Sequence, residues 1–429
     1  MKTYKYPNKE SWKTLSKRAE LNQNNLNSTV RSVLDNVKSY GDNALFNYAL
    51  KFDQLKLDEI QVSKQELKQP ETSIAPELKT AIQSAYENIY CFHKAQKIKE
   101  QIIQTKPGVK CWRKAIAIER VGLYIPGGEA PLFSTILMLG IPALLAGCKE
   151  IILCSPAKNN QALDPAILYT AKLIGIKKIF KVGGAQAIAA MAYGTETIPK
   201  VYKIFGPGNQ FVTKAKEMLQ QEGVAIDLPA GPSELLVIAD QTAIPTFVAA
   251  DLLSQAEHGK DSQVILLSDD EKTLNACLKA IQIQFKDLPR KKVTAKALIN
   301  SKAILLNNLD ECMDFSNEYA PEHLIIASEN SSAISEKIVN AGSVFLGNYS
   351  CESAGDYASG TNHTLPTNGY AKNYSGVSLD SFTKKVTFQQ INKEGLLNIG
   401  NTIEIMAEAE QLIAHKNAVS IRLKEINNE

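Results

Sequence analysis

Short apolar runs recur between residues 120 and 240, each ending in glycine or proline and followed by sequence with helical spacing. Strands that alternate with helices predict a parallel β-sheet with crossover helices. Because the runs are continuous, we expect both faces of the sheet to be covered. Ligands of such sheets bind where the strands end, and the glycines gather there. The runs are VGLYIPGG (121–128), EIILCSP (150–156), KIFKVGG (178–184), VYKIFGPG (201–208) and VAIDLPAGP (224–232).

A second series of helical and strand-like segments follows between residues 247 and 348. It predicts another α/β layer, so we expect an α/β protein with two Rossmann-like, doubly wound domains and parallel sheets. The expected helices are FVAADLLSQAEHG (247–259), EKTLNACLKAIQIQF (271–285) and SSAISEKIVN (331–340). The expected strands are SQVILLS (262–268), KAILLN (302–307) and GSVFLGN (342–348).

Two segments near the C-terminus depart from this alternation. ESAGDYASGTNHTLPTNG (352–369) is too rich in Gly, Ser, Thr and Asn for a regular element and too long for an idle connection. We therefore expect it to be a functional loop. From Asn401 onward, apolar residues are spaced as a helical stripe, which predicts a C-terminal helix.

The nineteen residues from Ala130 to Cys148 carry no charge and are long enough to be considered as a membrane span. Two prolines and two glycines interrupt them, and a strand-like run follows at once. A buried helix of an α/β layer is the better interpretation. The N-terminus lacks the apolar core of a secretory signal, so we expect a cytoplasmic protein without membrane contact.

Composition and charge exclude further classes of protein. With 44% hydrophobic and 22% charged residues, the chain resembles an ordinary soluble globular protein. A net charge of +3, with lysines spread along the chain, does not indicate nucleic-acid binding. The seven cysteines include no CxxC pair and lie mostly in apolar segments, which is typical of reduced thiols in a cytosolic protein.

Histidine is scarce in this chain, and four of the five histidines lie among polar residues in its second half. Imidazole is the commonest metal ligand among side chains and the usual general base near neutral pH. This clustering therefore favours a metal-assisted enzyme. The four residues are His258, His323, His363 and His415.

Gln255 and His258 stand three residues apart, so on a helix they share a face and an amide oxygen and an imidazole can meet one ion. Zinc prefers four N, O or S ligands, which makes Asp356 and His415 the candidates for the remainder. The alternative is a helix-surface histidine bonded to the neighbouring Glu257.

Glu322 and His323 follow the proline of the sequence APEHL. In a turn, both side chains can line one cleft, where a carboxylate and an imidazole activate water and shuttle protons. The alternative is a solvated glutamate beside a partly buried histidine. For His363, an ordinary hydrogen bond of the loop is almost as good an explanation as catalysis.

The sequence GPGNQF (206–211) begins like the dinucleotide fingerprint G-x-G-x-x-G but has Phe211 at the sixth position. Asp227 ends a strand-like run about twenty residues later, where the ribose-binding acid of that fingerprint would lie. Without its third glycine the motif is weak evidence. A tight strand-to-helix turn is the simpler interpretation.

Eight segments occur in an order that resembles the signature segments of histidinol dehydrogenases, the zinc- and NAD-dependent enzymes that end histidine biosynthesis. The resemblance covers nearly the whole chain, and no single segment decides it. The segments are GLYIPGG, GGAQAIAA, FGPGN, PAGPSE, DLLSQAEHG, YAPEHL, GDYASGTNHTLPT and AEAEQLIAHKNAV.

The resemblance implies a role for each matching residue, with one zinc ion per subunit and NAD as cofactors. Glu322 would activate a water molecule and His323 would be the general base. The implied zinc ligands are Gln255, His258, Asp356 and His415. The other implied substrate contacts are Ser233, His323, His363 and Glu410, besides the zinc ligands themselves. The implied NAD contacts are Tyr124, Gln186 and Asn209.

The implied reaction takes L-histidinol through L-histidinal to L-histidine and reduces two NAD. The resemblance also implies a domain-swapped homodimer, in which the C-terminal segment of one subunit completes the partner's site. On one continuous helix, Glu410 and His415 would flank a site, because five residues turn about 140°. The expected layout is an N-terminal arm (1–20), a larger α/β domain with the metal and catalytic residues (21–125 and 235–377), a NAD-side domain (126–234) and a C-terminal segment (378–429).

Four alternatives remain open from the sequence. A relative with the same zinc and NAD would act on another amino alcohol or a diol, and a zinc hydrolase would use the same ligands without NAD. A non-catalytic binding protein would keep the fold but tolerate loss of Glu322 and His323. A thiohemiacetal on Cys148 or Cys154 is the alternative mechanism, although neither thiol has a sequence neighbour that would lower its pKa.

Overall fold

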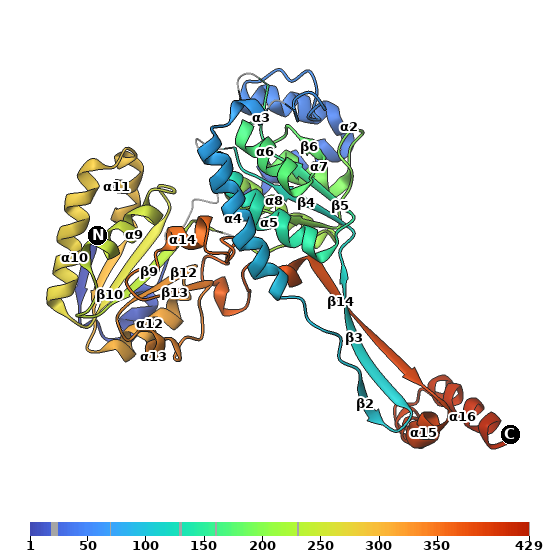
Figure 1. The fold of residues 1–429 in the computed structure, drawn as a ribbon. Coiled ribbons are helices and arrows are strands. Elements are labelled where there is room, and N and C mark those ends of the chain that lie inside the picture. Colours follow the sequence, from blue (N-terminus) through green and yellow to red (C-terminus); the bar gives the residue numbers. More distant parts are fainter. Residues whose placement is uncertain (19–24, 69, 128–130, 159–160, 230, 429) are drawn as a thin grey trace. The chain divides into compact units, whose positions relative to one another are not determined.

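A computed structural model describes residues 1–429 except 19–24, 69, 128–130, 159–160, 230 and 429. Two of the segments that carry the family resemblance, GLYIPGG and PAGPSE, each contain one residue outside the described part, Gly128 and Ala230. The chain forms two compact units, whose elements Figure 1 labels. The main unit holds Met1–Ala95 and Ile118–Phe382, and the small unit holds Gln96–Ala117 and Thr383–Glu429.

In the main unit, five of the described strands form a parallel sheet in the order β6-β5-β4-β7-β8. Alternate residues of a strand point to opposite faces. Leu123 packs with α4, α5 and α6, whereas its neighbour Tyr124 packs with α2, α7 and α8. The predicted parallel sheet with both faces covered is confirmed. Its strands are β4 (Arg120–Tyr124), β5 (Glu150–Cys154), β6 (Lys178–Phe180), β7 (Lys203–Phe205) and β8 (Ala225–Ile226).

The helices of this five-stranded sheet include the uncharged stretch that was considered as a membrane span. It forms α5, in which Ile136, Leu137 and Met138 are at most 1% exposed, so the predicted buried helix is confirmed. No described helix is long and apolar enough to cross a membrane. The helices are α2 (Leu26–Asp53), α3 (Pro70–Ser73), α4 (Pro76–Ala95), α5 (Phe133–Ala146), α6 (Pro165–Ile174), α7 (Gly184–Tyr193) and α8 (Gln210–Gln221).

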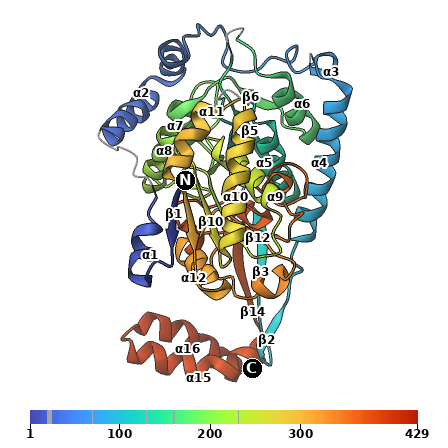
Figure 2. The ribbon, with the colours of Figure 1, turned by 90° about the vertical axis from the view of Figure 1, so that its left-hand side faces the viewer.

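A second parallel sheet of the main unit has the order β1-β11-β10-β9-β12-β13 among the described strands. One face of this six-stranded sheet packs on α9, α10 and α11 and the other on α1, α12 and α13, as alternate residues of β9 require. Figure 2 shows α9, α10 and α11 from their outer side. Its strands are β1 (Lys2–Lys5), β9 (Glu234–Ala239), β10 (Gln263–Ser268), β11 (Lys302–Leu305), β12 (His323–Ala327) and β13 (Ser343–Leu346).

The remaining helices of the main unit follow these strands. The segment 352–369, expected to be irregular throughout, begins with a short helix, α14. The helices are α1 (Lys9–Leu15), α9 (Pro245–Ala256), α10 (Glu271–Gln284), α11 (Lys291–Asn300), α12 (Leu309–Tyr319), α13 (Ser331–Ser335) and α14 (Glu352–Tyr357). Short 3-10 turns lie at Phe285–Asp287, Tyr370–Lys372 and Leu379–Phe382.

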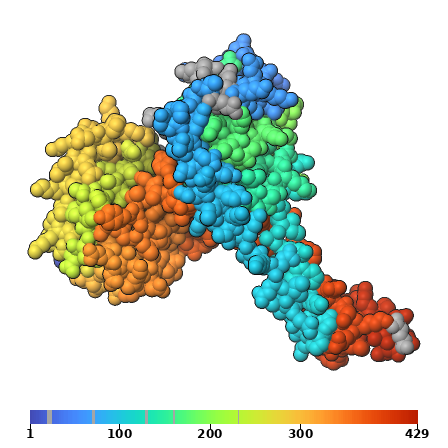
Figure 3. Space-filling view, in the orientation of Figure 1, coloured from blue at the N-terminus to red at the C-terminus, as the bar shows by residue number. Residues whose placement is uncertain are grey.

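The domain layout differs from the expected one at several places. Apolar residues of α2 and α4 pack on the five-stranded sheet, and Figure 3 shows α4, in blue, on the surface of the main unit. The described part of 21–95 therefore groups with 126–234 and not with 235–377, because its apolar faces match that sheet. The expected N-terminal arm is instead partly an edge strand, since β1 pairs with β11 in parallel; residues 19 and 20 of it lie outside the described part.

In the small unit, β2 (Ile103–Lys106), β3 (Val109–Ala117) and β14 (Thr383–Ile391) form an antiparallel sheet. The expected C-terminal helix is two helices, α15 (Lys393–Ala409) and α16 (Ile413–Asn428). Gln411, with φ at 61°, breaks the helix between Glu410 and His415. The pairing of 96–117 with the C-terminal segment was not predicted, because the sequence gives no local signal for a sheet joining distant segments.

Candidate active site

The Glu322–His323 pair lies where α12 ends and β12 begins. Ala320 ends the helix in the left-handed conformation, with φ at 53°, and Pro321 then leads the chain into the strand. Both residues of the pair are buried, with 7% and 3% of their surface exposed. The expected alternative of a solvated glutamate is therefore wrong for this structure.

Both side chains of the pair meet the backbone of Glu234, the first residue of the neighbouring strand β9. The Glu234 N–H donates to Glu322 Oε2 at 2.8 Å, and His323 Nδ1 lies 3.2 Å from the Glu234 carbonyl oxygen. His323 Nδ1 is also 3.6 Å from Glu322 Oε2. A carboxylate and an imidazole thus share one site although adjacent residues of a strand normally diverge.

Helix α9 lies against this pair with the side chains at positions 251, 254 and 255, and His258 follows two residues after the helix ends at Ala256. Gln255 is buried, and its Nε2 lies 3.3 Å from Glu322 Oε2 and 3.3 Å from His323 Nδ1. Its Oε1 is buried without a hydrogen-bond partner among the described residues. An unpartnered buried amide oxygen is costly, so a ligand for it is expected.

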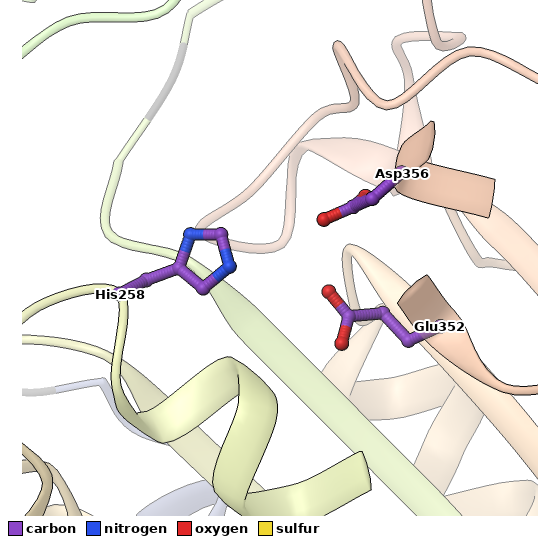
Figure 4. A group of neighbouring side chains, drawn as sticks. All are labelled: His258, Glu352 and Asp356. Carbon is purple, nitrogen blue, oxygen red and sulfur yellow. The ribbon is translucent and has the colours of Figure 1, made fainter. Parts of the chain in front are cut away.

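His258, Glu352 and Asp356 gather next to this helix, as Figure 4 shows. One nitrogen of the histidine and one oxygen of each carboxylate all lie within 4.8 Å of one another. The acids stand four residues apart on α14, so they share a side of that helix. His323 Nε2 is 3.7 Å from Asp356 Oδ1, which joins this group to the Glu322–His323 pair.

Glu352 is a residue of this group that the sequence analysis missed. It is 1% exposed; Ser254 donates to its Oε2 at 2.7 Å, while Oε1 has no partner among the described residues. Its i, i+4 spacing from Asp356 was the available signal, but the small polar residues around it favoured a loop. The group now holds two carboxylates instead of one.

Burial and charge act together on the pKa values of the group. Burial alone would lower the pKa of His323, but the charge of Glu322 and the contact with Asp356 raise it well above its ordinary value. Burial would raise the pKa of Asp356, and His323 outweighs this effect and lowers it. Burial and the charge of Asp356 raise the pKa of Glu352 to about 8. The site thus stabilises a cation beside an ionised Asp356.

The donor set fits a divalent metal ion. An imidazole, two carboxylates and the free Gln255 Oε1 supply the nitrogen and oxygen ligands that zinc accepts. Of the four implied ligands, the structure brings Gln255, His258 and Asp356 to one region. His415 lies in the small unit, at the first turn of α16, and Glu410 lies in the same unit at the end of α15.

His363 lies in the loop that follows α14. Its Nδ1 is 3.0 Å from the Asp356 carbonyl oxygen, and its Nε2 is 3.1 Å from Thr135 Oγ1 on α5. Burial lowers the pKa of His363, which favours a neutral ring that donates from Nδ1 and accepts at Nε2. The loop hydrogen bond considered as the alternative for His363 is therefore present. Ser233, the remaining implied substrate contact, directly precedes β9.

The implied NAD contacts follow three strands of the five-stranded sheet. Tyr124 ends β4, Gln186 lies in the first turn of α7 after β6, and Asn209 follows β7. The Tyr124 hydroxyl accepts from the Gly184 N–H at 3.0 Å, and Asn209 is exposed and caps α8. These residues thus lie at the carboxyl ends of parallel strands, where such sheets bind nucleotides.

The backbone of the turn requires the first glycine of the GPGNQF segment. Gly206 has φ at 128°, and a Cβ atom there would lie 2.1 Å from the Tyr124 carbonyl oxygen. Asp227 forms a buried ion pair with Lys216 and accepts from the Gly206 N–H at 2.8 Å. Asp227 therefore braces this turn, which does not support the ribose-binding role considered for it.

Comparisons with known proteins show the family of this chain. The model of the family described as histidinol dehydrogenase matches residues 16–423. The chain belongs to the histidinol dehydrogenase family. Curated histidinol dehydrogenases of Bacteroides thetaiotaomicron and Bacteroides fragilis are 56% and 55% identical to it, each over 99% of this chain and 99% and 100% of the relative. A crystal structure of histidinol dehydrogenase from Elizabethkingia anophelis is 59% identical, with a TM-score of 0.98, and covers 100% of this chain and 99% of that one.

Membership of the histidinol dehydrogenase family makes the chain an oxidoreductase and leaves the cysteine mechanism to be tested. Burial raises the pKa of the Cys148 thiol to about 12, and burial also raises that of Cys154. A thiol is a poor nucleophile when its thiolate is disfavoured. We expect Cys148→Ala and Cys154→Ala to keep turnover within about threefold of the unmodified enzyme, as for substitutions away from the reacting atoms. Loss of NADH formation in either folded variant would instead support the mechanism through a thiohemiacetal.

Proposed function

We propose that this chain oxidises L-histidinol through L-histidinal to L-histidine, with zinc and NAD, as the last step of histidine biosynthesis. The observation that carries the proposal is the buried Glu322–His323 pair beside Gln255, His258 and Asp356. The family match supports the substrate, since relatives of more than half identity carry the name histidinol dehydrogenase.

The proposed reaction has two oxidation steps with different needs. The alcohol loses a hydride to the first NAD and a proton to the protein, which gives the aldehyde. Water adds to the aldehyde, and the hydrate loses a hydride to the second NAD and further protons, which gives the carboxylate. NAD supplies the acceptor for both hydrides. The protein must therefore take up protons in both steps and activate water in the second.

His323 and Glu322 are suited to these two tasks. His323 would accept the protons, because its Nε2 side faces Asp356 while its Nδ1 faces the Glu234 carbonyl oxygen and is held there. Glu322 would activate the water, because its Oε2 is fixed by the Glu234 N–H and its carboxylate is shielded from solvent. Both groups are placed by backbone contacts, which reduces the reorganisation needed for reaction.

Gln255, His258 and Asp356 would hold the zinc ion, with His415 from the small unit. When bound, the ion would position the substrate by its amino and imidazole nitrogens. Gln255 would turn its free Oε1 to the ion and keep its Nε2 on the catalytic pair. One side chain would thus fix the distance between the metal and the proton acceptor.

We further propose a homodimer in which the small unit of one copy supplies Glu410 and His415 to the main unit of the other. The small unit supports this because α16 has no buried residue and two of its apolar side chains, Ile413 and Ile421, are exposed. Exposed apolar surface of this kind marks an interface. The exposed apolar residues of α15 and α16 include Leu397, Ile405, Met406, Ile413 and Ile421.

The test is the amount of NADH formed per L-histidinol consumed, with and without a metal chelator. We expect about two NADH per substrate molecule, and loss of turnover on metal removal that added zinc reverses. Other amino alcohols and diols serve as comparison substrates. Preferred turnover of one of these would favour the relative with another substrate, and hydrolysis without NADH would favour a zinc hydrolase.

A further inference from the structure

Arg18, at the end of the described N-terminal segment, contacts Glu234, which lies next to the proposed catalytic pair. Its Nε and Nη2 donate to the two carboxylate oxygens of Glu234, both at 2.8 Å. The Glu234 side chain is 1% exposed. The Arg18 guanidinium group therefore supplies the counter-charge for a carboxylate removed from water. The backbone of the same Glu234 holds Glu322 and His323.

The guanidinium group also contacts the turn that leads into the catalytic pair. Arg18 Nη2 donates to the Tyr319 carbonyl oxygen at 2.8 Å and lies 3.4 Å from that of Ala320. Its Cζ lies 3.8 Å from the centre of the Tyr319 ring. Ala320 adopts the left-handed conformation, which costs energy for a residue other than glycine. Arg18 therefore stabilises a strained turn two residues before Glu322.

A third segment is attached through the same carboxylate. The Asn368 N–H donates to Glu234 Oε1 at 2.9 Å. Asn368 belongs to the loop that carries His363. The Arg18–Glu234 contact thus joins the start of β9, the turn before β12 and the loop after α14.

We propose that Arg18 is a positioning residue for the Glu322–His323 pair. It acts through the Glu234 backbone and the 319–320 turn and does not touch the reacting atoms. The proposal rests on the proposed function, since it needs Glu322 and His323 to be the reacting pair. A lysine keeps the charge but has neither the two-pronged geometry nor the planar group that stacks on Tyr319.

Two variants separate positioning from folding. Arg18→Lys keeps a cation beside Glu234, and the double variant Arg18→Gln with Glu234→Gln removes both charges, so neither leaves a buried charge alone. Arg31→Lys is the matched control, because Arg31 pairs with Glu222 at 2.6 Å at an exposed position of the main unit. Each protein is assayed as the zinc-loaded full chain for kcat, for KM toward L-histidinol and NAD, for bound zinc and for melting temperature.

For Arg18→Lys we expect kcat to fall on the order of tenfold to a hundredfold, because small displacements of reacting groups have effects of this size. KM for NAD, bound zinc and the folded state are expected to stay as in the unmodified enzyme, and the double variant to lose at least as much kcat. Arg31→Lys should leave kcat unchanged. Unchanged kcat in folded Arg18→Lys, or an equal loss in Arg31→Lys, would overturn the proposal. An unmodified enzyme that does not oxidise L-histidinol would instead overturn the proposed function, and this inference with it.

Discussion

His323→Asn is expected to slow both oxidation steps strongly, because each step needs the same proton acceptor. General-base catalysis contributes about a hundredfold to ten-thousandfold, so kcat should fall by that factor for L-histidinol and for L-histidinal. Asparagine can still donate to the Glu234 carbonyl oxygen, which His323 Nδ1 reaches at 3.2 Å. The fold and the bound zinc should therefore remain, and both are measured beside NADH formation.

Glu322→Gln should separate the two steps. Glutamine keeps an oxygen that accepts from the Glu234 N–H, so the backbone contact at 2.8 Å is preserved. Only water activation is lost, so we expect the NADH formed per L-histidinol to fall from about two toward one while L-histidinal accumulates. Kinetics started from L-histidinal should show the larger loss in kcat.

The pattern of these two variants decides the roles of the pair. Equal losses in both steps for both variants would mean that Glu322 and His323 act as one unit and that the division between water activation and proton uptake is wrong. Near-normal turnover in both would mean that other groups take up the protons and activate the water. Ser254→Ala is a useful comparison, because it removes the hydrogen bond to Glu352 at 2.7 Å and leaves the Glu322–His323 pair intact.

The helices and strands that depend on local sequence pattern were predicted best. Continuous apolar runs such as 150–156, next to segments with helical spacing, predict buried strands, and both parallel sheets contain these strands. The assignment of α2 and α4 to a domain was wrong, because amphipathic helices show which face is buried but not which sheet covers it.

The catalytic candidates were also visible in the sequence, whereas their supports were not. Arg18 and Glu234 are 216 positions apart, and neither lies in a motif that points to the other. Glu352 was hidden because its neighbours favour a loop, although the chain forms a short helix there. Such contacts depend on tertiary packing, which can override local propensity.

Mixing two inactive variants should restore activity if the proposed dimer shares its sites. In a swapped dimer of one His323→Asn chain and one Glu410→Ala, His415→Ala chain, one site receives both defects. The other site combines an unmodified main unit with an unmodified small unit. Random assembly makes about half the dimers mixed, so co-expressed variants should recover about a quarter of the unmodified activity.

Each variant alone should be inactive, because the first lacks the proton acceptor at both sites and the second lacks an implied zinc ligand and a substrate contact at both. The measurement is the L-histidinol-dependent rate of NADH formation per subunit after co-expression, with each variant expressed alone as control. If each copy completes its own site, every chain in the mixture carries a defect in its only site, and no activity can return. A rate at the level of the separate variants, in a sample shown to contain mixed dimers, would therefore place Glu410 and His415 in the site of their own chain.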